Sequence, residues 1–557
     1  MPVTRRSFLE HTLFTAAAGL AAAKTAFAAD VPKSDSDSAE SKSAARPKVN
    51  LAVIGLNGRG MSHVEGFLGD DRVEIVALCD VYEHTWAKAQ NALASAGRKA
   101  ARTYQDIRKL LEDKDVHAVS IATPNHWHTL AGVWAMQAGR DVYVEKPVSH
   151  NVSEGRRLEQ ARIKYNRVCQ AGLQSRSTTA CQKAVEYIRD GHIGKVLLAR
   201  GLCYKRRASI GHFADSTAPA GLDYDIWLGP APKRQFNKNR FLYNWHWNWD
   251  YGNGDIGNQG VHQMDIARWA LGKTLPNSVM ALGGRFGYQD DGQTPNTQLA
   301  LFDYGDSKLL FEVRGLLTPG YMMVRDCGDI VYGTEGFVAF TADYGTAVAF
   351  DNKGKEVQRF KGTKNHFHNF IDAVISRQQS DLHCPVLEGH YSAALCHLAN
   401  TSYRLGHEES FAVRCPEVME DVDMAEAYGR YAQHLADCAY FAEDPNETNR
   451  PRRSSGNRRR AAAGQQPQAA HNEANSHVDT APQQEPSRKV PPPPKEDDGG
   501  AGKIARPDQP LKLEKMTYQL GPKLAFDPGS ETYGSNQKAN QFLTREYREP
   551  FVVPERV

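Results

Sequence analysis

The feature that most constrains the fold is a glycine-rich turn between a short apolar segment and a segment of helical character. Residues 49–54 read V-N-L-A-V-I, and residues 55–60, which follow directly, read G-L-N-G-R-G. Glycines at such a junction permit a tight turn and a close approach of the backbone to a pyrophosphate, which the first N–H groups of the helix then bind. The usual spacing is G-x-G-x-x-G, and here Asn57 replaces the middle glycine, with Gly58 beside it. The turn predicts a dinucleotide site; an ordinary flavodoxin-like turn is the alternative.

A carboxylate at the end of the second apolar run strengthens the dinucleotide interpretation. Asp80 follows the run at residues 73–78 and lies 20 residues after Gly60. A carboxylate at this place accepts hydrogen bonds from the hydroxyls of the adenosine ribose. It would also repel a 2′-phosphate, so the sequence favours NAD over NADP as the cofactor.

Short apolar runs alternate with helical segments in the first third of the chain. Strands are expected over residues 49–54, 73–78, 116–121 and 142–144. Between the last two, residues 128–138 have apolar side chains at helical spacing. This alternation predicts a doubly wound parallel sheet of the Rossmann type.

Beyond about residue 174, strand candidates follow one another without helices between them. They cover residues 196–202, 278–288, 298–304, 308–313 and 337–340. Two helices are expected after them, over residues 367–375 and 391–405. The expected fold class is therefore α/β, with an N-terminal Rossmann-type parallel sheet and a C-terminal α+β domain whose sheet is largely antiparallel.

The chain also divides by composition into folded and unfolded parts. Residues 4–9 read T-R-R-S-F-L and precede an Ala-rich stretch with an A-F-A site, which is typical of a twin-arginine export signal. We therefore expect a periplasmic or otherwise exported protein. The predicted parts are a signal (1–28), a linker (29–47), an NAD-binding domain (48–173), a substrate and oligomerisation domain (174–440), a disordered low-complexity segment (444–510) and a C-terminal segment packing back on the body (511–557).

Charge and cysteine content exclude several classes of partner. Lys and Arg number 68 against 65 Asp and Glu, a balance that does not indicate a nucleic-acid partner. After the signal no apolar run approaches the roughly 20 residues that span a bilayer, so no stable membrane anchor is expected. The nine cysteines have irregular spacing, typical of neither a disulfide framework nor a metal site. Buried free thiols are expected instead.

Four motifs in order give the chain a family resemblance. They are the turn at 55–60, T-P-N-H-W-H at 123–128, E-K-P at 145–147 and G-D-I-G-N-Q-G-V-H-Q-M-D at 254–265. With these motifs the chain resembles the Gfo/Idh/MocA oxidoreductases. The resemblance implies that Lys146 contacts both the substrate hydroxyl and the nicotinamide ribose, and that His262 is the acid/base. It also implies a homo-oligomer, dimer or tetramer.

The segment around His262 both supports and departs from the family pattern. An imidazole suits proton exchange with a carbinol hydroxyl because its ordinary pKa is near neutrality. If His262 opens a helix, Asp265 lies one turn further on and could orient it. The family's first carboxylate here is replaced by Asn258, which cannot take a proton but can bind a sugar hydroxyl. Any second acid/base role would then pass to another group, such as Asp255.

An aromatic segment over residues 243–251 indicates a carbohydrate site. It reads Y-N-W-H-W-N-W-D-Y, and aromatic faces stack on sugar C–H surfaces while Asn, His and Asp bind hydroxyls. Aromatic packing between the domains is the alternative. Because Trp245 and Trp247 alternate, one could face the pocket and the other the core. Arg176, at the expected domain junction, is a further candidate.

The candidate residues fall into three groups. The predicted catalytic residues are Lys146, His262, Asn258 and Asp265. The predicted cofactor-binding residues are Gly55, Asn57, Gly58, Arg59, Gly60, Asp80, Thr123, Pro124, Asn125, His128, Glu145, Lys146 and Gln174. The predicted substrate-binding residues are Arg176, Trp245, Trp247, Asp255, Asn258 and His262.

The sequence thus predicts an NAD-dependent oxidoreductase acting on a hydroxyl of a sugar, polyol or glycoside. A redox-neutral enzyme with a tightly bound NAD, catalysing glycoside elimination or hydrolysis, epimerisation or transhydrogenation, is the first alternative. A non-catalytic carbohydrate-sensing protein is the second.

Overall fold

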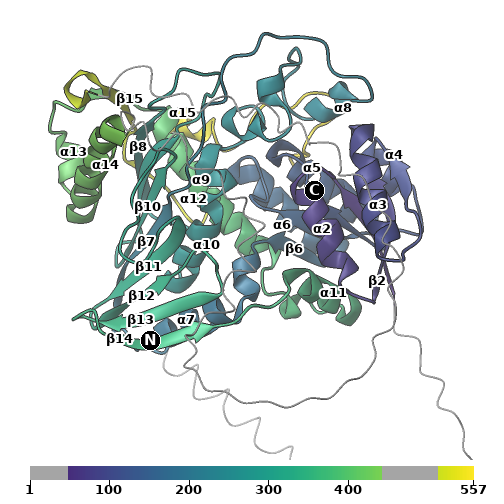
Figure 1. The fold of residues 1–557 in the computed structure, drawn as a ribbon, viewed down its shortest axis with the longest axis horizontal. Coiled ribbons are helices and arrows are strands. Elements are labelled where there is room, and N and C mark those ends of the chain that lie inside the picture. The colour runs from purple at the N-terminus through teal and green to yellow at the C-terminus, as the bar shows by residue number, and fades with distance from the viewer. Residues whose placement is uncertain (1–47, 442–511) are drawn as a thin grey trace, which may run out of the picture. The chain divides into compact units, whose positions relative to one another are not determined.

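A parallel sheet of six strands forms the first part of the computed structural model, which describes residues 48–441 and 512–557 (Figure 1). The strands run in the order β3-β2-β1-β4-β5-β6. They are β1 (Val49–Ile54), β2 (Val73–Cys79), β3 (Arg102–Tyr104), β4 (Ala118–Ile121), β5 (Asp141–Glu145) and β6 (Cys169–Gly172). The order reverses between β1 and β4, and in such sheets ligands bind beyond the carboxyl ends of the strands at this point.

Helices complete this Rossmann-type unit. They are α2 (Arg59–Leu68), α3 (Trp86–Ser95), α4 (Ile107–Leu111), α5 (Asn125–Gln137) and α6 (Val152–Tyr165). Phe67 of α2 packs against Phe367 of the later helix α11 (His366–Ser376), with ring centroids 4.8 Å apart. One apolar cluster therefore joins the first strands to a segment some 300 residues downstream.

The second sheet is larger and confirms the predicted fold class. It has eleven strands in the order β14-β13-β12-β11-β7-β10-β9-β8-β16-β15, and β17 pairs with β8. Within this second sheet, the β7–β10 pair is parallel and the other described strand pairs are antiparallel. The strands are β7 (Val196–Cys203), β8 (Ser278–Gly284), β9 (Thr297–Asp303), β10 (Lys308–Arg314), β11 (Cys327–Gly333), β12 (Gly336–Phe340), β13 (Thr346–Asp351), β14 (Glu356–Lys361), β15 (His407–Ser410), β16 (Thr517–Leu520) and β17 (Leu524–Ala525).

Helices of the second part of the chain are α7 (Thr179–Arg189), α8 (Tyr224–Leu228), α9 (Gly254–Asn258), α10 (Gly260–Leu271), α12 (Val386–Arg404), α13 (Pro416–Met419) and α14 (Val422–Phe441). Of these, α9, α10 and α12 lie between the second sheet and the Rossmann unit, α13 and α14 lie at its far edge, and α8 lies beside α5 (Figure 1). Strand β8 ends at Gly284, four residues before the predicted end, because Arg285 turns away to pair with Asp290 at 2.6 Å.

The segment after residue 511 adds to both domains. Strand β16 extends the second sheet beside β8, and α15 (Gln537–Asn540) follows. Near its end, Arg548 donates to the carbonyl oxygen of Gly229, and Phe551 packs on Trp127 of the Rossmann unit at 5.5 Å. The predicted signal (1–28), linker (29–47) and low-complexity segment (444–510) lie outside the described residues. Within the described ranges, no helix is long and apolar enough to cross a membrane.

Candidate active site

The glycine-rich turn has the geometry that its sequence indicates. Gly55 has a φ of +82°, and a Cβ there would lie 2.8 Å from the backbone of Ala122. A Cβ at Gly60 would lie only 1.8 Å from the carbonyl oxygen of Gly55. Gly58 has a φ of +48° and precedes α2, where a Cβ would meet open space. The turn therefore brings the start of α2 against β1 and leaves its N–H groups facing an open region.

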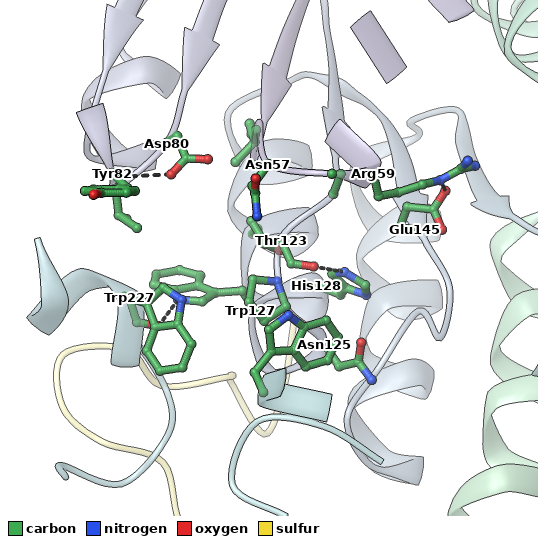
Figure 2. Close-up of a pocket in the computed structure, with 18 of the residues that line it drawn as sticks. Asn57, Arg59, Asp80, Tyr82, Thr123, Asn125, Trp127, His128, Glu145 and Trp227 are labelled. Atoms are coloured by element: carbon green, nitrogen blue, oxygen red, sulfur yellow. Dashed lines mark hydrogen bonds and ion pairs between the residues drawn. The ribbon is translucent and has the colours of Figure 1, made fainter. Parts of the chain in front are cut away.

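Asn57 explains how the turn tolerates the loss of the middle glycine. Its side chain is exposed and lines the cavity next to the turn. In Figure 2 it lies between Asp80 and Arg59. A side chain is thus accommodated here because it extends into the cavity and not into the packed turn.

Asp80 lies at one end of this cavity. Its Oδ2 accepts the N–H of Leu56 at 2.7 Å, and its Oδ1 accepts the N–H of Tyr82 at 2.9 Å (Figure 2). Burial raises the pKa of Asp80, and these two N–H groups act in the opposite direction. Each carboxylate oxygen retains a lone pair, so the group can still accept hydrogen bonds from two ribose hydroxyls.

The cavity has a volume of about 420 Å³ and gathers most of the predicted cofactor residues. Those in its wall are Gly55, Asn57, Gly58, Arg59, Asp80, Thr123, Pro124, Asn125, His128, Glu145 and Lys146. Gly60 and Gln174 do not line it. Gly60 supports the turn, and Gln174 donates to the carboxylate of Glu145 at 3.1 Å, so it acts through Glu145.

Two tryptophans in the cavity wall were not among the predicted site residues. The indole N–H of Trp127 donates to the carbonyl oxygen of Trp227 at 3.1 Å, which ties α5 to α8. Both rings line the cavity below the glycine turn in Figure 2. Trp127 belongs to the quoted motif at 123–128, whereas no local signal marks Trp227.

The buried carboxylate of Glu145 is the centre of an ion-pair cluster. Its Oε1 accepts from Arg59 at 2.6 Å and from His63 at 3.1 Å. Burial alone would raise the pKa of Glu145, but Arg59 and His63 outweigh burial and hold it well below the usual range. Glu145 therefore stays ionised and fixes the end of β5, directly before Lys146.

Lys146 presents an amine to the other end of the cavity. Its Nζ donates to the carbonyl oxygen of Asn258 at 2.6 Å. Burial lowers the pKa of Lys146 to about 8, with contributions from Arg59, Lys205 and Arg207 against the opposing effect of Glu145. A lysine with this pKa can gain or lose its proton near neutral pH.

Asp255 is not available as the second acid/base that the sequence suggested. It is buried and forms a two-point ion pair with Arg207, at 2.6 and 2.8 Å. Burial would raise the pKa of Asp255, but Arg207 lowers it below its ordinary value. Arg207 also donates to the Tyr243 hydroxyl at 2.9 Å, and Asn258 donates to the same oxygen at 3.0 Å. The sequence did not predict Arg207 as a site residue, because its partner Asp255 is 48 residues away along the chain.

The prediction that Asp265 orients His262 is wrong. Asp265 is buried and accepts from Arg176 at 2.8–3.1 Å and from Ser392 at 2.7 Å. His262 lies in the first turn of α10, and its Nδ1 is buried without a hydrogen-bond partner among the described residues. Burial lowers the pKa of His262 well below its ordinary value, with Lys146 as the next contribution. His262 is partly exposed but does not line the cavity.

Arg176 is likewise a structural residue and not a substrate contact. Its guanidinium is buried, bridges Asp265 and Glu388 at 2.8 and 2.9 Å, and lies over the Trp269 ring at 4.9 Å. The guanidinium nitrogens Nε and Nη2 of Arg176 donate only to the carboxylates of Asp265 and Glu388 among the described residues. The ion pair between Arg176 and Asp265 therefore fastens the junction after β6 to α10.

The aromatic segment divides as its alternation suggests. Trp245 lines the cavity together with Leu242 and Tyr243. Trp247 is buried and stacked under the Arg285 guanidinium at 4.7 Å, outside the cavity wall. Trp247 is therefore a packing residue, and its prediction as a substrate contact is corrected.

Fold and site together define a class of protein. The open helix start at the glycine turn, the Asp80 carboxylate and the Lys146 amine lie in one cavity at the crossover of a parallel sheet. These residues fit a dinucleotide, whose pyrophosphate the turn would hold and whose adenosine ribose Asp80 would bind. The chain is a two-domain dinucleotide-binding protein of the Rossmann type.

Family models make the assignment specific. Residues 49–173 match the NAD-binding Rossmann fold of the oxidoreductase family, and residues 200–286 match its C-terminal α/β domain. Over these two stretches the chain is similar to the Gfo/Idh/MocA family of NAD-binding oxidoreductases.

Two named relatives are similar to this chain over part of their length. Levoglucosan dehydrogenase of Pseudarthrobacter phenanthrenivorans is 30% identical over 240 residues, 42% of this chain and 54% of that protein. Glycosyl hydrolase family 109 protein 2 of Phocaeicola vulgatus is 28% identical over 185 residues, 33% of this chain and 44% of that protein. The chain thus spans about half the length of these relatives. Among solved structures, levoglucosan dehydrogenase with NADH and levoglucosan is 18% identical, with a TM-score of 0.49 over 63% of this chain and 97% of that one.

Proposed function

We propose that the protein oxidises a hydroxyl-bearing carbon of a sugar, polyol or glycoside with NAD as cofactor. The observation that carries the proposal is the Lys146 amine in the wall of a cavity whose far end holds Asp80. Beside Lys146 the wall is formed by Tyr243, Trp245 and Asn258, which offer an aromatic face and polar groups to a sugar. When bound, NAD supplies the hydride acceptor.

Lys146 is the group best placed to exchange the hydroxyl proton. Its Nζ is held by the Asn258 carbonyl, so two of its bonding directions remain for the substrate. With a pKa of about 8, the neutral amine can accept a proton while hydride leaves the same carbon. His262 is not part of this wall, and its lowered pKa keeps the imidazole neutral.

A second candidate is redox-neutral turnover with a retained NAD. Two observations favour it. Asn258 stands where the family pattern has a carboxylate, and several relatives, including the Phocaeicola vulgatus protein, are described as glycosyl hydrolases of family 109. Transient oxidation of one carbon would allow glycoside cleavage or epimerisation without net formation of NADH.

One experiment separates these functions. The purified protein is denatured, released NAD is counted per chain, and sugars and glycosides are screened for both NADH and product. An empty site with accumulating NADH supports the dehydrogenase. Stoichiometric NAD with product but no NADH supports redox-neutral turnover. Lys146→Ala should abolish either activity, and unchanged turnover in this variant would refute the assignment of Lys146.

We also propose export with the cofactor already bound. The twin-arginine pattern at residues 4–9 indicates passage of a folded chain, and free NAD is scarce outside the cytoplasm. A cofactor that left in each cycle would be lost there, so tight retention is expected. A homo-oligomer, dimer or tetramer, remains a proposal from the family resemblance. Fractionation of cells and light scattering of the purified protein test these two points.

A further inference from the structure

The residues that follow β7 alternate between two sides of the second sheet. On one side, Lys205 donates to the Gln259 side chain at 3.1 Å, and Arg207 pairs with Asp255. On the other side, Tyr204 donates to Glu312 at 2.7 Å, and Arg206 is exposed, whereas Lys205 and Arg207 are half-buried. This is the period of two of an extended chain. It places Lys205 and Arg207, but not Arg206, toward the helices that carry Asn258 and His262.

Positive charge exceeds negative charge around this end of the cavity, where Lys205 lies behind Gln259 and outside the wall itself. Arg59 neutralises Glu145, and Arg207 neutralises Asp255. Within the described residues, Lys146 and Lys205 are the cations of this region that form no ion pair. Lys146 donates to the carbonyl oxygen of Asn258 and Lys205 to the side chain of the next residue, Gln259, so the two lysines lie near one another. The positive charge of Lys205 accordingly contributes to the lowered pKa of both Lys146 and His262.

Lys205 has no carboxylate as an ion-pair partner in the described part of the chain. It is half-buried, and within 4.0 Å of its Nζ no Asp or Glu oxygen occurs in the described part of the chain. Its hydrogen bond goes instead to the amide oxygen of Gln259, which is neutral and itself lines the cavity. A cation withdrawn from water is costly unless it is paired, so this position suits an anion supplied from outside the chain.

The cofactor's pyrophosphate does not account for this cation. The pyrophosphate belongs at the glycine turn, beside Arg59 at the start of α2. Lys205 instead contacts the α9–α10 junction, next to the carbonyl that holds Lys146. An anion at Lys205 would therefore lie on the substrate.

Building on the proposed function, we propose that the substrate is an anionic carbohydrate, whose carboxylate or sulfate group binds Lys205 while its reacting hydroxyl meets Lys146. Hydrogen bonds between charged groups are about twice as strong as neutral ones. Loss of one such contact should lower the affinity for an anionic sugar by about 10- to 100-fold and leave its neutral analogue unchanged.

The test compares matched sugars and matched variants of the full-length, NAD-loaded protein. The methyl glycosides of glucose, galactose and mannose are each supplied as the neutral hexoside, the uronide and the 6-sulfate. Single-turnover NADH formation and calorimetric binding are both measured. Lys205→Gln removes the proposed charge, Lys205→Arg keeps it, and Arg206→Gln removes the neighbouring exposed charge as the control.

We expect a uronide or a 6-sulfate to exceed its neutral analogue by at least about tenfold in kcat/KM or in affinity. This preference should be lost in Lys205→Gln, kept in Arg206→Gln and largely kept in Lys205→Arg. The two anionic series show whether the group is a carboxylate or a sulfate. Equal or better use of the neutral sugars, or an equal loss for both kinds in Lys205→Gln, would overturn the inference.

Binding separates this inference from the proposed oxidation. If an anionic sugar binds in a Lys205-dependent way but no hydride transfer or product follows, the proposed function fails and the anion site stands. If neutral sugars are oxidised and no anionic sugar binds better, the anion site fails and the proposed function stands. If no sugar binds, the anion site is refuted.

Discussion

At the scale of single residues, the site depends on which charges are neutralised and which are not. The buried carboxylates of Glu145 and Asp255 each pair with an arginine, Arg59 and Arg207, with contacts of 2.6 Å. Lys146 directly follows Glu145, and within the described residues the one hydrogen bond of its amine goes to a carbonyl oxygen, that of Asn258. Its proton is therefore the one most readily exchanged at the cavity wall.

The pH dependence of oxidation should follow Lys146. Oxidation requires the neutral amine, so kcat/KM should rise with pH and level off above a midpoint near 8, the pKa of about 8 that burial gives this lysine. His262→Asn should keep that midpoint, because the lowered pKa of His262 leaves its imidazole neutral over the same range. The measurement is a pH–rate profile of both proteins under single-turnover conditions. Loss of the rising limb in His262→Asn would assign the proton exchange to His262.

Asp80 should control the affinity for NAD. Asp80→Ala removes the acceptor for ribose hydroxyls and also frees the N–H groups of Leu56 and Tyr82. Because hydrogen bonds to a charged group contribute about 1.5–3 kcal/mol, the Kd for NAD should rise about 10- to 100-fold. Titration calorimetry with NAD and NADP checks this. Glu83→Ala, a nearby exposed carboxylate, is the control and should bind like the wild type.

Sequence predicts single residues well where the backbone or the strand end determines their position. Gly55, Asp80 and Lys146 fall into this group, since a turn and two strand ends place them. Asp265 and Arg176 do not, because an ion pair is decided by side chains that tertiary packing brings together. Glu388, the second carboxylate of Arg176, is 212 residues away and has no local signal.

At the scale of elements, the site is built from the ends of strands and the starts of helices. β1 leads into the glycine turn and α2, β5 leads into Lys146, and α9 supplies the carbonyl that holds it. The apolar runs that predicted β1, β2, β7 and β9 are buried strands. Strand β14 could not be predicted in this way, because five of its six residues are exposed and its run is polar.

The close contact of α2 with β1 should make Gly60 intolerant of any side chain. A Cβ there would overlap the Gly55 carbonyl, which is backbone and cannot rotate away. Gly60→Ala should lower the free energy of unfolding by about 2–3 kcal/mol or more and abolish NAD binding. Gly97→Ala is the matched control, since that glycine has open space around it and a φ of +68°. This variant should lower the free energy of unfolding by about 1–2 kcal/mol. Denaturant unfolding measures the change in stability, and titration with NAD measures binding. NAD binding by a stable Gly60→Ala protein would contradict the expectation.

At the scale of the whole molecule, the segment over residues 512–557 connects the two domains. Arg545 donates to the carbonyl oxygen of Asp250, and Arg548 donates to that of Gly229. Tyr547 donates to Glu154 at the start of α6. The segment thus holds the loop that walls the substrate end of the cavity and, through Phe551, the helix behind Trp127.

Phe551 should be important for both stability and cofactor binding. Its ring is buried, 5.5 Å from the Trp127 ring and 6.4 Å from that of Trp134. Phe551→Ala should cost about 3–5 kcal/mol of stability, the usual range for such a truncation, and weaken NAD binding because Trp127 lines the cavity. Val552→Ala, at a half-buried neighbour, should cost less than about 1.5 kcal/mol. Thermal unfolding with and without NAD measures both effects, and equal behaviour of the two variants would contradict this role.

The position of Phe551 also sets an order of events during synthesis. The turn, Asp80 and Trp127 are all made within the first quarter of the chain, yet the helix that carries Trp127 is covered by a ring made more than 400 residues later. A nascent chain still on the ribosome would hold the nucleotide in a half-built pocket, from which it could leave freely. Secure loading of NAD should therefore wait until these last contacts have formed, which makes cofactor capture a check on completed assembly.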